Sequence, residues 1–405
     1  MLTRGSLLVF IAFCTVIWLG TNTALTQNSA ADFQNILREK AAFDETGFAA
    51  LEQGETVVRL LPVQDKREVA VCGLVSLHVP AEVFLQSFRE GMAHKTNPAV
   101  LEIGRLSSTP TLDDFRTLTI ENRDLEDMKE CVVGDCRLKL SAPMIERLHK
   151  ELDFQAPDYQ IQATHLLKQM LLDYVRDYLE RGDVALLDYS DKAKEVRLAE
   201  EQRSLMSASS YVSAVVPKFA QALKGFSTPE LRLVENAIVW SKIKFGLKPV
   251  LAINHIMVYK REAETGPQVL IASKQIYANH YFNSSLGLTA FVNVPGKNSG
   301  SYLFYENRSR ADGLEGPLSS LKRGIIENKA IDGLTAILES SKVNLNARAV
   351  NPNESTTSTV GEPSWKRWRI GRVLFLCLFS ITALFALFAF GNFNWKAGIS
   401  GEAPH

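Results

Sequence analysis

Neither sign of charge is in excess in this sequence of 405 residues, because 45 lysine and arginine residues balance 45 aspartate and glutamate residues. A protein that binds nucleic acid holds the phosphate backbone with a surplus of basic side chains, usually gathered on one domain or face. The balance gives no electrostatic support to that function. We therefore expect no nucleic-acid partner.

Motifs for catalysis and for metal binding are also lacking. The sequence contains no G-x-S-x-G, no H-E-x-x-H and no glycine-rich phosphate loop. Ser319 and Lys322 form a Ser-x-x-Lys pair, but the Ser-Asp-Asn and Lys-Thr-Gly motifs of serine acyl enzymes are absent, and a solvated helix start accounts for the pair. We predict no metal and no cofactor, identify no catalytic residue, and favour a binding protein over an enzyme.

Cysteine is scarce: the chain has five, and three of them lie outside the two apolar segments described below. Cys131 and Cys136 flank Val-Val-Gly-Asp, a sequence suited to a turn, so a local disulfide between them is predicted in an oxidising compartment. Two free buried thiols are the alternative. Cys72 lies in an apolar run and is expected to be a small buried side chain.

Two long apolar runs occur, and the first lies within residues 1–24. Arg4 gives this segment a positive head, and its apolar core from Leu7 to Gly20 is shorter than the roughly 20 residues that a spanning helix needs. This layout predicts a secretory signal peptide over 1–24. An uncleaved signal anchor is the alternative.

The second run, Val373–Gly391, is uncharged and long enough to cross a bilayer as a helix. We predict a single transmembrane helix over 370–391 and a short tail over 392–405. Basic residues are more frequent before this helix than after it, which under the positive-inside rule would favour a cytoplasmic main domain. Because that rule weakens behind a long translocated domain, we expect a cell-membrane protein with an extracytoplasmic main domain, periplasmic in a Gram-negative bacterium. The reversed topology is the alternative.

Residues 31–341 are expected to form an extracytoplasmic α+β domain, in which strand-forming runs and helical patterns alternate. In its first part, valine-rich and leucine-rich runs bounded by turn residues indicate strands, and a proline opens a helix. The elements expected there are strands at 56–61, 68–79, 100–106 and 115–120, and a helix from Pro80 to Gly91.

Residues 121–225 are expected to be a mainly helical insertion. Its clearest helix runs from Ile161 to Arg181, where apolar residues recur at helical spacing until Gly182 ends the pattern. Residues 231–307 contain five strand-like runs separated by glycine and proline turns, which predicts an antiparallel meander.

Pro317 begins an amphipathic helix that is expected to run to Ser340 and to lie on a sheet. Residues 342–364 are rich in Asn, Ser, Thr and Pro and poor in large apolar residues, so they cannot bury enough surface to fold alone. We predict a flexible stalk between the domain and the membrane.

The order of these elements resembles the START-like or helix-grip superfamily of lipid-transfer and polyketide-cyclase-like proteins. The resemblance covers residues 55–120 and 230–341, and residues 121–225 depart from it, since a plain member has short connections there. It implies a curved antiparallel sheet that wraps the C-terminal helix, residues 317–340, and leaves a hydrophobic cavity between sheet and helix. The family has no strict catalytic motif to carry over.

Five side chains of the expected meander are candidates for a ligand site. Period-2 alternation places His255 and Tyr259 on one face of a strand, and His280 and Phe282 on one face of another. Tyr302, on the last strand, is placed to close the same surface. Imidazole and phenol groups among apolar neighbours are typical of a cavity for an amphipathic ligand. Satisfied core positions are the alternative interpretation of both histidines.

The sequence therefore predicts a membrane-tethered extracytoplasmic domain that binds a lipid or another hydrophobic small molecule without catalysis. One alternative is an envelope interaction or assembly protein that uses residues 121–225 as the surface for a partner protein. A second alternative is a hydrolase whose site is assembled from scattered residues.

Overall fold

The computed structural model describes residues 29–41, 43–93, 99–209, 216–224, 235–261, 267–294, 300–314 and 319–350. The expected signal peptide (1–24), transmembrane helix (370–391) and tail (392–405) lie outside these ranges. Within them, no helix combines the length and the apolar character that crossing a membrane requires.

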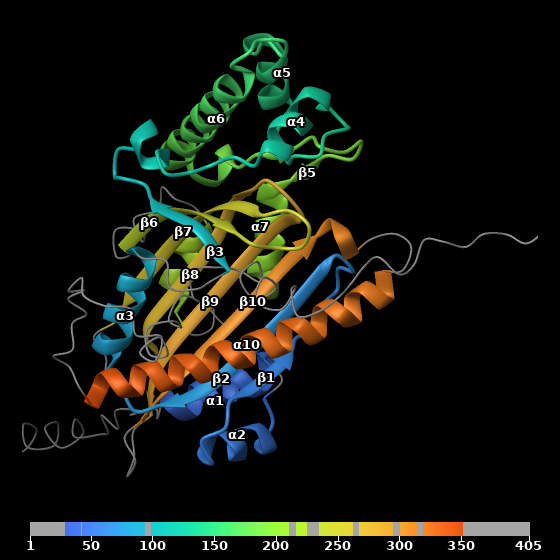
Figure 1. Cartoon of the computed structure of the whole chain (residues 1–405). Helices are drawn as coiled ribbons and strands as arrows, with labels where there is room; N and C mark the ends of the chain where they lie inside the picture. The colour runs from blue at the N-terminus through green and yellow to red at the C-terminus, as the bar shows by residue number, and fades with distance from the viewer. Residues whose placement is uncertain are drawn as a thin grey trace, which may run out of the picture.

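A curved eight-stranded sheet, antiparallel throughout, organises an α+β fold (Figure 1). Its strand order is β1-β2-β10-β9-β8-β7-β6-β3. The strands are β1 (Val57–Leu60), β2 (Glu68–Leu77), β3 (Val100–Arg105), β6 (Glu235–Ile243), β7 (Val250–Lys260), β8 (Pro267–Ala278), β9 (Phe282–Val294) and β10 (Gly300–Ala311). The expected antiparallel meander is confirmed as β6 to β10. The N-terminal strands extend it at both edges, β1 and β2 beside β10 and β3 beside β6.

The strand expected at 115–120 does not form. Thr111 and Asp114 make a capping box that starts a short 3₁₀ helix, Leu112–Phe115. Phe115 then packs against the ring of Trp240 with 6.2 Å between ring centroids. The prediction was wrong because its apolar residues serve this local packing and not a ladder of backbone hydrogen bonds.

The strand that was expected to hold both His280 and Phe282 is also interrupted. β8 stops at Ala278, and Tyr281, the only described non-glycine residue with a positive φ (59°), turns the chain so that β9 begins at Phe282. A register shift between Ile253 and Asn254 of β7 further disturbs the alternation near the end of β8. His280 and Phe282 therefore do not lie on one face of a single strand.

Helices cover both faces of the sheet, and we name each face after its cover. The α10 face packs against α3 (Ala81–Ala93) and α10 (Ser319–Val350), and its strand residues include Val71, Val239, Ile256, Ile271, Phe291 and Leu303. The insertion face packs against α1 (Ser29–Lys40), α2 (Glu45–Glu52) and the helices of residues 121–225. Its strand residues include Cys72, Ile253, Met257, Leu286 and Phe304.

The long helix α10 runs along β2. At the start of β2 the Arg323 guanidinium donates to the carbonyl oxygen of Glu68 at 3.0 Å, and past its end the amide of His78 donates to the Asn346 side chain at 3.1 Å. Between these contacts the helix lies so close that a Cβ at Gly73 would come within 2.4 Å of a Leu338 side-chain carbon. Glycine at this position lets helix and strand approach each other.

The α3 helix covers only one half of the α10 face. Arg89 pairs with Glu235 at the start of β6, and Phe84 stacks on Phe291 with 5.0 Å between ring centroids. We call the other half, in which β2 begins and β10 ends, the distal half. In Figure 1, α3 lies over the lower left of the sheet, and the distal half of the central strands extends above α10.

The C-terminal helix is longer than expected, and this corrects the predicted stalk boundary. α10 continues from the predicted end at Ser340 to Val350, through residues that were assigned to the stalk. Leu345 is fully buried in the core, and Arg348 donates to Ser87 of α3 at 2.9 Å. These tertiary contacts stabilise helical turns whose composition alone does not favour folding. The rest of the expected stalk, 351–364, lies outside the described residues.

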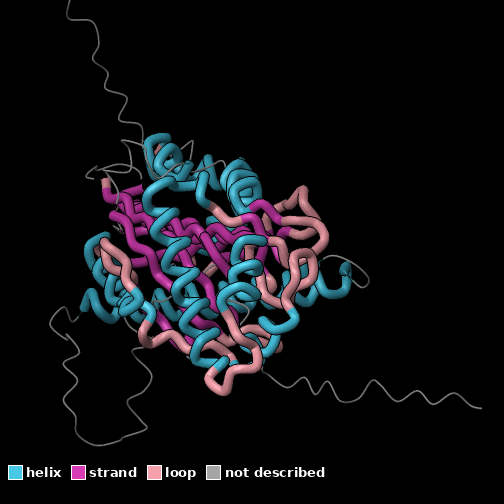
Figure 2. Tube along the Cα trace, turned by 90° about the horizontal axis from the view of Figure 1, so that it is seen from above, coloured by secondary structure: helices cyan, strands magenta, loops and turns pink. Residues whose placement is uncertain are grey.

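Residues 121–225 contain α4 (Asn122–Glu130), α5 (Ala142–Glu151), α6 (Tyr159–Arg181), α7 (Leu198–Ala208) and α9 (Pro217–Lys224), with a short hairpin of β4 (Asp188–Tyr189) and β5 (Val196–Arg197). Helix α6 matches the expected helix and ends at Gly182, whose φ is 66°. Seen from above, α4 to α6 lie over one end of the sheet (Figure 2). The insertion is therefore packed onto the domain.

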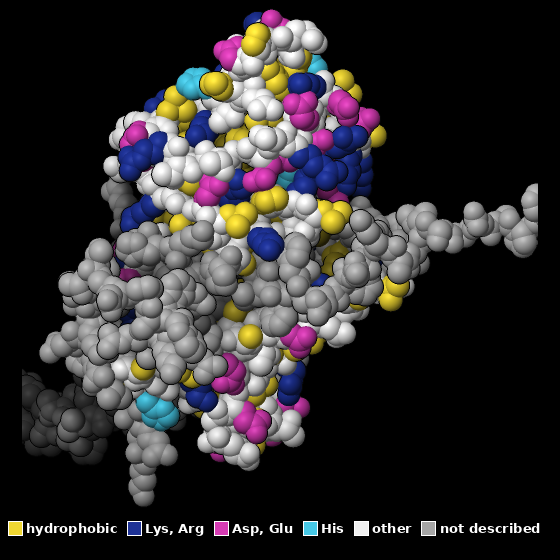
Figure 3. Space-filling model, viewed as in Figure 1, with side chains coloured by type: hydrophobic (Ala, Val, Ile, Leu, Met, Phe, Trp, Pro, Cys, Tyr) yellow, Lys and Arg dark blue, Asp and Glu magenta, His cyan; other side chains and the backbone are white. Residues whose placement is uncertain are grey.

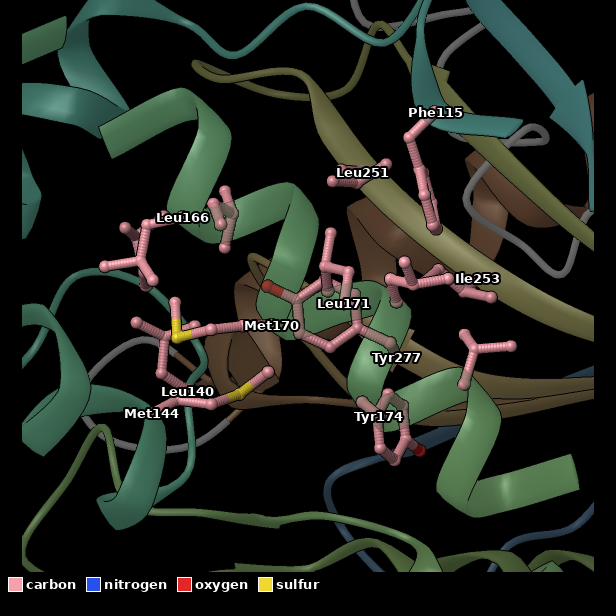
Figure 4. Packing of buried hydrophobic residues seen from close by; sticks show 14 of the residues in the cluster. Phe115, Leu140, Met144, Leu166, Met170, Leu171, Tyr174, Leu251, Ile253 and Tyr277 are labelled. Carbon is pink, nitrogen blue, oxygen red and sulfur yellow. The ribbon is translucent and has the colours of Figure 1, made fainter. Parts of the chain in front are cut away.

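The contact between insertion and sheet is a continuous apolar core. Figure 4 shows Leu171 and Tyr174 of α6 beside Ile253 and Tyr277 of the sheet, and Met170 of α6 turned toward Met144 of α5. The Tyr174 hydroxyl also donates to the carbonyl oxygen of Ile276 at 2.5 Å. The insertion thus covers the distal half of the insertion face, where removing it would expose buried aromatic and aliphatic residues.

We predict that Gly104→Ala lowers the free energy of unfolding by about 1–3 kcal/mol, because a Cβ at this position would lie 2.5 Å from the buried indole of Trp240. The indole cannot easily move away, since its N–H donates a hydrogen bond to the carbonyl oxygen of Asp114. Urea unfolding followed by tryptophan fluorescence measures the effect. Gly324→Ala is the control: nothing lies within 4 Å of that Cβ, and alanine in a helix should stabilise by up to about 1 kcal/mol. Equal effects of the two substitutions would contradict the packing argument.

Candidate functional site

His255 is a buried residue of the insertion face. Its Nδ1 lies 2.9 Å from the Tyr178 hydroxyl and its Nε2 lies 2.9 Å from the Asn236 side-chain oxygen. Burial, with the nearby Lys274 ammonium, lowers the pKa of His255 to about 3, so the ring is neutral. Both ring nitrogens are thus engaged by the protein, with Nε2–H donating to Asn236 and Nδ1 accepting from Tyr178.

His280 joins the sheet to the insertion. Its Nε2 lies 3.0 Å from both carboxylate oxygens of Asp124, and its Nδ1 lies 3.2 Å from the carbonyl oxygen of Arg137. Asp124 also contacts the Lys248 ammonium at 3.1 Å and accepts from Asn279 at 3.1 Å. This cluster fastens α4 to the β6–β7 and β8–β9 turns.

The other three expected site residues lie in separate places. Phe282 packs against Phe245 on the α10 face, with 5.0 Å between ring centroids. Tyr259 packs against Phe219 of α9, and the Tyr302 hydroxyl accepts from Gln34 of α1 at 3.3 Å. The five residues therefore do not gather at one surface: His255, Tyr259 and Tyr302 lie on the insertion face, Phe282 on the other, and His280 in a turn.

Cys131 and Cys136 lie at disulfide-bonding distance, with 4.3 Å between their Cα atoms. Val132 and Asp135 pair as a tight hairpin between them, and Gly134 adopts a φ of 90°, which favours glycine. The amide of Gly134 donates to the carbonyl oxygen of Ser190 at 2.8 Å. The cysteine pair joins the two ends of this hairpin, which lies next to β4.

The distal half of the α10 face carries a group of buried polar side chains. Asn254 of β7 lies directly opposite Gln275 of β8, and Ser241 lies on the neighbouring β6. Their exposed fractions are 1%, 0% and 0%, respectively. We call these three residues the amide cluster. Among the residues that the structure describes, the side-chain polar atoms of all three have no hydrogen-bond partner.

The polar character continues across β9 and β10, where the side chains are paired. The hydroxyls of Ser285 and Ser309 lie directly opposite each other at 2.5 Å, and Ser309 donates to Asn307 at 3.0 Å. Gly287 leaves space between these strands, since a Cβ there would lie 3.1 Å from the Tyr305 hydroxyl. A polar strip thus crosses the distal half of the α10 face, and its β6–β8 end is the unpaired part.

The sheet separates charge between its two faces. Among the described strand residues, the buried charged side chains all lie on the insertion face: Glu68, Lys242, Lys274, Glu306, Arg308 and Arg310. They pair there, as Arg308 does with Glu68 and Glu306 at 2.7 Å each. The buried polar residues on the α10 face are serine, threonine, asparagine and glutamine.

Leaving the amide cluster unpaired is costly. A buried polar group without a partner costs about 1–3 kcal/mol, so five unpaired atoms on three side chains cost a large share of the ~5–15 kcal/mol by which a domain is stable. The great majority of buried polar groups in proteins are paired, so each exception calls for an explanation. The amide cluster is therefore the candidate functional site.

The signal for this cluster was present in the sequence. Asn254 and Gln275 lie within two strand-like runs, next to His255 and Lys274, respectively, so that strand alternation places them on the face opposite to those residues. Sequence reasoning selected the histidines for their chemistry and passed over the amides. Only the pairing of β7 with β8 shows that the two amides face each other.

Comparisons of the chain with protein-family models, with curated proteins and with solved structures gave no match. The resemblance to the helix-grip superfamily therefore rests on the order of the elements. The functional argument rests on the geometry of the sheet.

The buried His255 predicts an acid-sensitive fold. The pKa of His255 is about 3 in the folded chain and about 6.5 in the unfolded chain, so protons bind preferentially to the unfolded chain. The contribution of the neutral ring to the free energy of unfolding is complete above pH 6.5 and is lost as the pH falls toward 3. Between pH 7.5 and 5.5 the wild type should lose about 1 kcal/mol more stability than His255→Gln. Urea titrations at the two pH values measure this difference. The exposed His78→Gln is the control, and a His255→Gln variant with the wild-type pH dependence would refute the assignment.

Proposed function

We propose that this chain is a membrane-tethered extracytoplasmic domain that binds a lipid or another amphipathic small molecule, without catalysis, on the α10 face of its sheet. The observation that carries the proposal is the amide cluster: Ser241, Asn254 and Gln275 are buried and unpaired among the described residues. Apolar side chains of the same face, including Val239, Ile256 and Ile271, surround it. Apolar walls with a few convergent polar groups are typical of small-molecule sites.

The fold is compatible with this proposal. A curved antiparallel sheet with a long C-terminal helix on one face is the arrangement that the helix-grip resemblance implies. Among the described elements, helix α10 contacts the edge strand β1 and its neighbour β2, and α3 contacts β3 and β8. Ser241, Asn254 and Gln275, in the distal half of β6 to β8, are nevertheless buried.

The location is inferred from two features. The uncharged run 373–391, within the expected transmembrane helix, supports a membrane tether, although it lies outside the described residues. The cysteine pair at disulfide-bonding distance supports an oxidising compartment, since disulfides persist outside the cytoplasm. Together they favour an extracytoplasmic domain at the cell membrane, in the periplasm of a Gram-negative host.

The partner-protein alternative has less support from the insertion. Its large apolar residues mostly cover the sheet, and Figure 3 shows acidic, basic and apolar side chains interspersed over its visible side. A mixed surface of this kind is typical of a solvated face. Val132 and Val133, on the cysteine hairpin, are exposed apolar residues that a partner could contact.

The proposal predicts that the purified chain carries a bound amphiphile. We expect native mass spectrometry of the full-length protein, released from a polyoxyethylene detergent, to show one bound molecule per chain, and organic extraction to recover it. A chain that carries nothing and takes up neither monoacylglycerol nor fatty acid when these are added would refute the proposal.

A further inference from the structure

The chemistry of the amide cluster restricts the polar head of a ligand. Each primary amide offers two N–H donors and one carbonyl acceptor, and the Ser241 hydroxyl offers both functions. A ligand that pairs all of these atoms must itself donate and accept hydrogen bonds. An anionic carboxylate only accepts, and would leave the carbonyl oxygens of Asn254 and Gln275 unpaired.

The surroundings of the cluster exclude charge compensation. The buried cations and carboxylates of the strands lie on the insertion face, so an ionised head on the α10 face would be desolvated without a counter-ion from the described strands. Lys274, next to Gln275 in sequence, turns to the insertion face and pairs with Asp183. The α10 face therefore favours an uncharged head.

We propose that the ligand of the α10 face is an amphiphile with an uncharged head of hydroxyl or amide groups, and that Asn254 and Gln275 select this head by hydrogen bonds. The apolar chain lies along Val239, Ile256 and Ile271 of the same face. This inference rests on the proposed function and adds the chemical class of the ligand and the two residues that determine it.

The test compares heads on one chain length. The full-length protein is titrated at pH 8 in polyoxyethylene detergent with 1-monopalmitoylglycerol, palmitate, hexadecyl phosphate or hexadecane, and binding is followed by native mass spectrometry. We expect monopalmitoylglycerol to bind at least about tenfold more tightly than the other three, because only its head pairs donors and acceptors without carrying charge.

The amides are tested with Asn254→Leu and Gln275→Leu. Each should weaken monopalmitoylglycerol binding by about tenfold or more while leaving the urea midpoint equal or higher, since an apolar side chain replaces unpaired polar atoms. Ser284→Ala is the matched control: Ser284 is also buried and unpaired among the described residues, but lies on the insertion face, so binding should not change. If a leucine variant lowers the midpoint, a variant closer in size replaces it, Asn254→Val or Gln275→Met.

The outcomes separate the two proposals. If none of the four probes binds the wild type, the proposed function and the inference both fail. Two results with a wild type that does bind amphiphiles would refute the inference alone. One is that palmitate, hexadecyl phosphate or hexadecane binds as tightly as monopalmitoylglycerol; the other is that both amide variants keep wild-type affinity. In the last case the amides would be structural or paired by water only.

Discussion

The pairing of β2 with β10 is the contact on which the rest of the structure depends. It joins Glu68–Leu77 to Ser301–Arg310 in ten consecutive residue pairs, across more than two hundred residues of sequence. Because of it, the N-terminal hairpin, α3 and the C-terminal helix belong to one domain. The pairing of β3 with β6 closes the opposite edge, so the insertion begins and ends against the same sheet.

The two faces of this sheet have different environments. The insertion and the N-terminal helices cover one face, and there each buried charge finds a partner on another element, as Lys274 does with Asp183 and Arg310 with Glu201. A buried ion pair contributes little net stability, but breaking one is costly, so such pairs fix how the helices sit on the sheet. The α10 face has neutral polar residues instead, and at β6 to β8 these are unpaired among the described residues.

The candidate site shows where sequence reasoning about function fails. Histidine, with its titratable ring, was the natural choice on a strand, and His255 and His280 turned out to be bound by Tyr178, Asn236 and Asp124. Asn254 stands next to His255 and points to the opposite face, so an error of one residue in choosing the important position moves the site across the sheet. Polar residues are recognised as unusual only when their burial and their partners are known, and both depend on strands brought together by the fold.

Local periodicity determined the class and most of the elements. Alternation with a period of two, bounded by glycine and proline, is sufficient for the meander β6 to β10, and apolar residues at helical spacing are sufficient for α3, α6 and the first part of α10. The tertiary structure alone decided the strand order, the end of β8, the absence of a strand at 115–120 and the continuation of α10 to Val350. These features depend on contacts between distant residues, such as Phe115 with Trp240 and Arg348 with Ser87, whose energies outweigh local preference. The amide cluster belongs to the same class, because its three members come from three strands and only the register of the sheet brings them to one face.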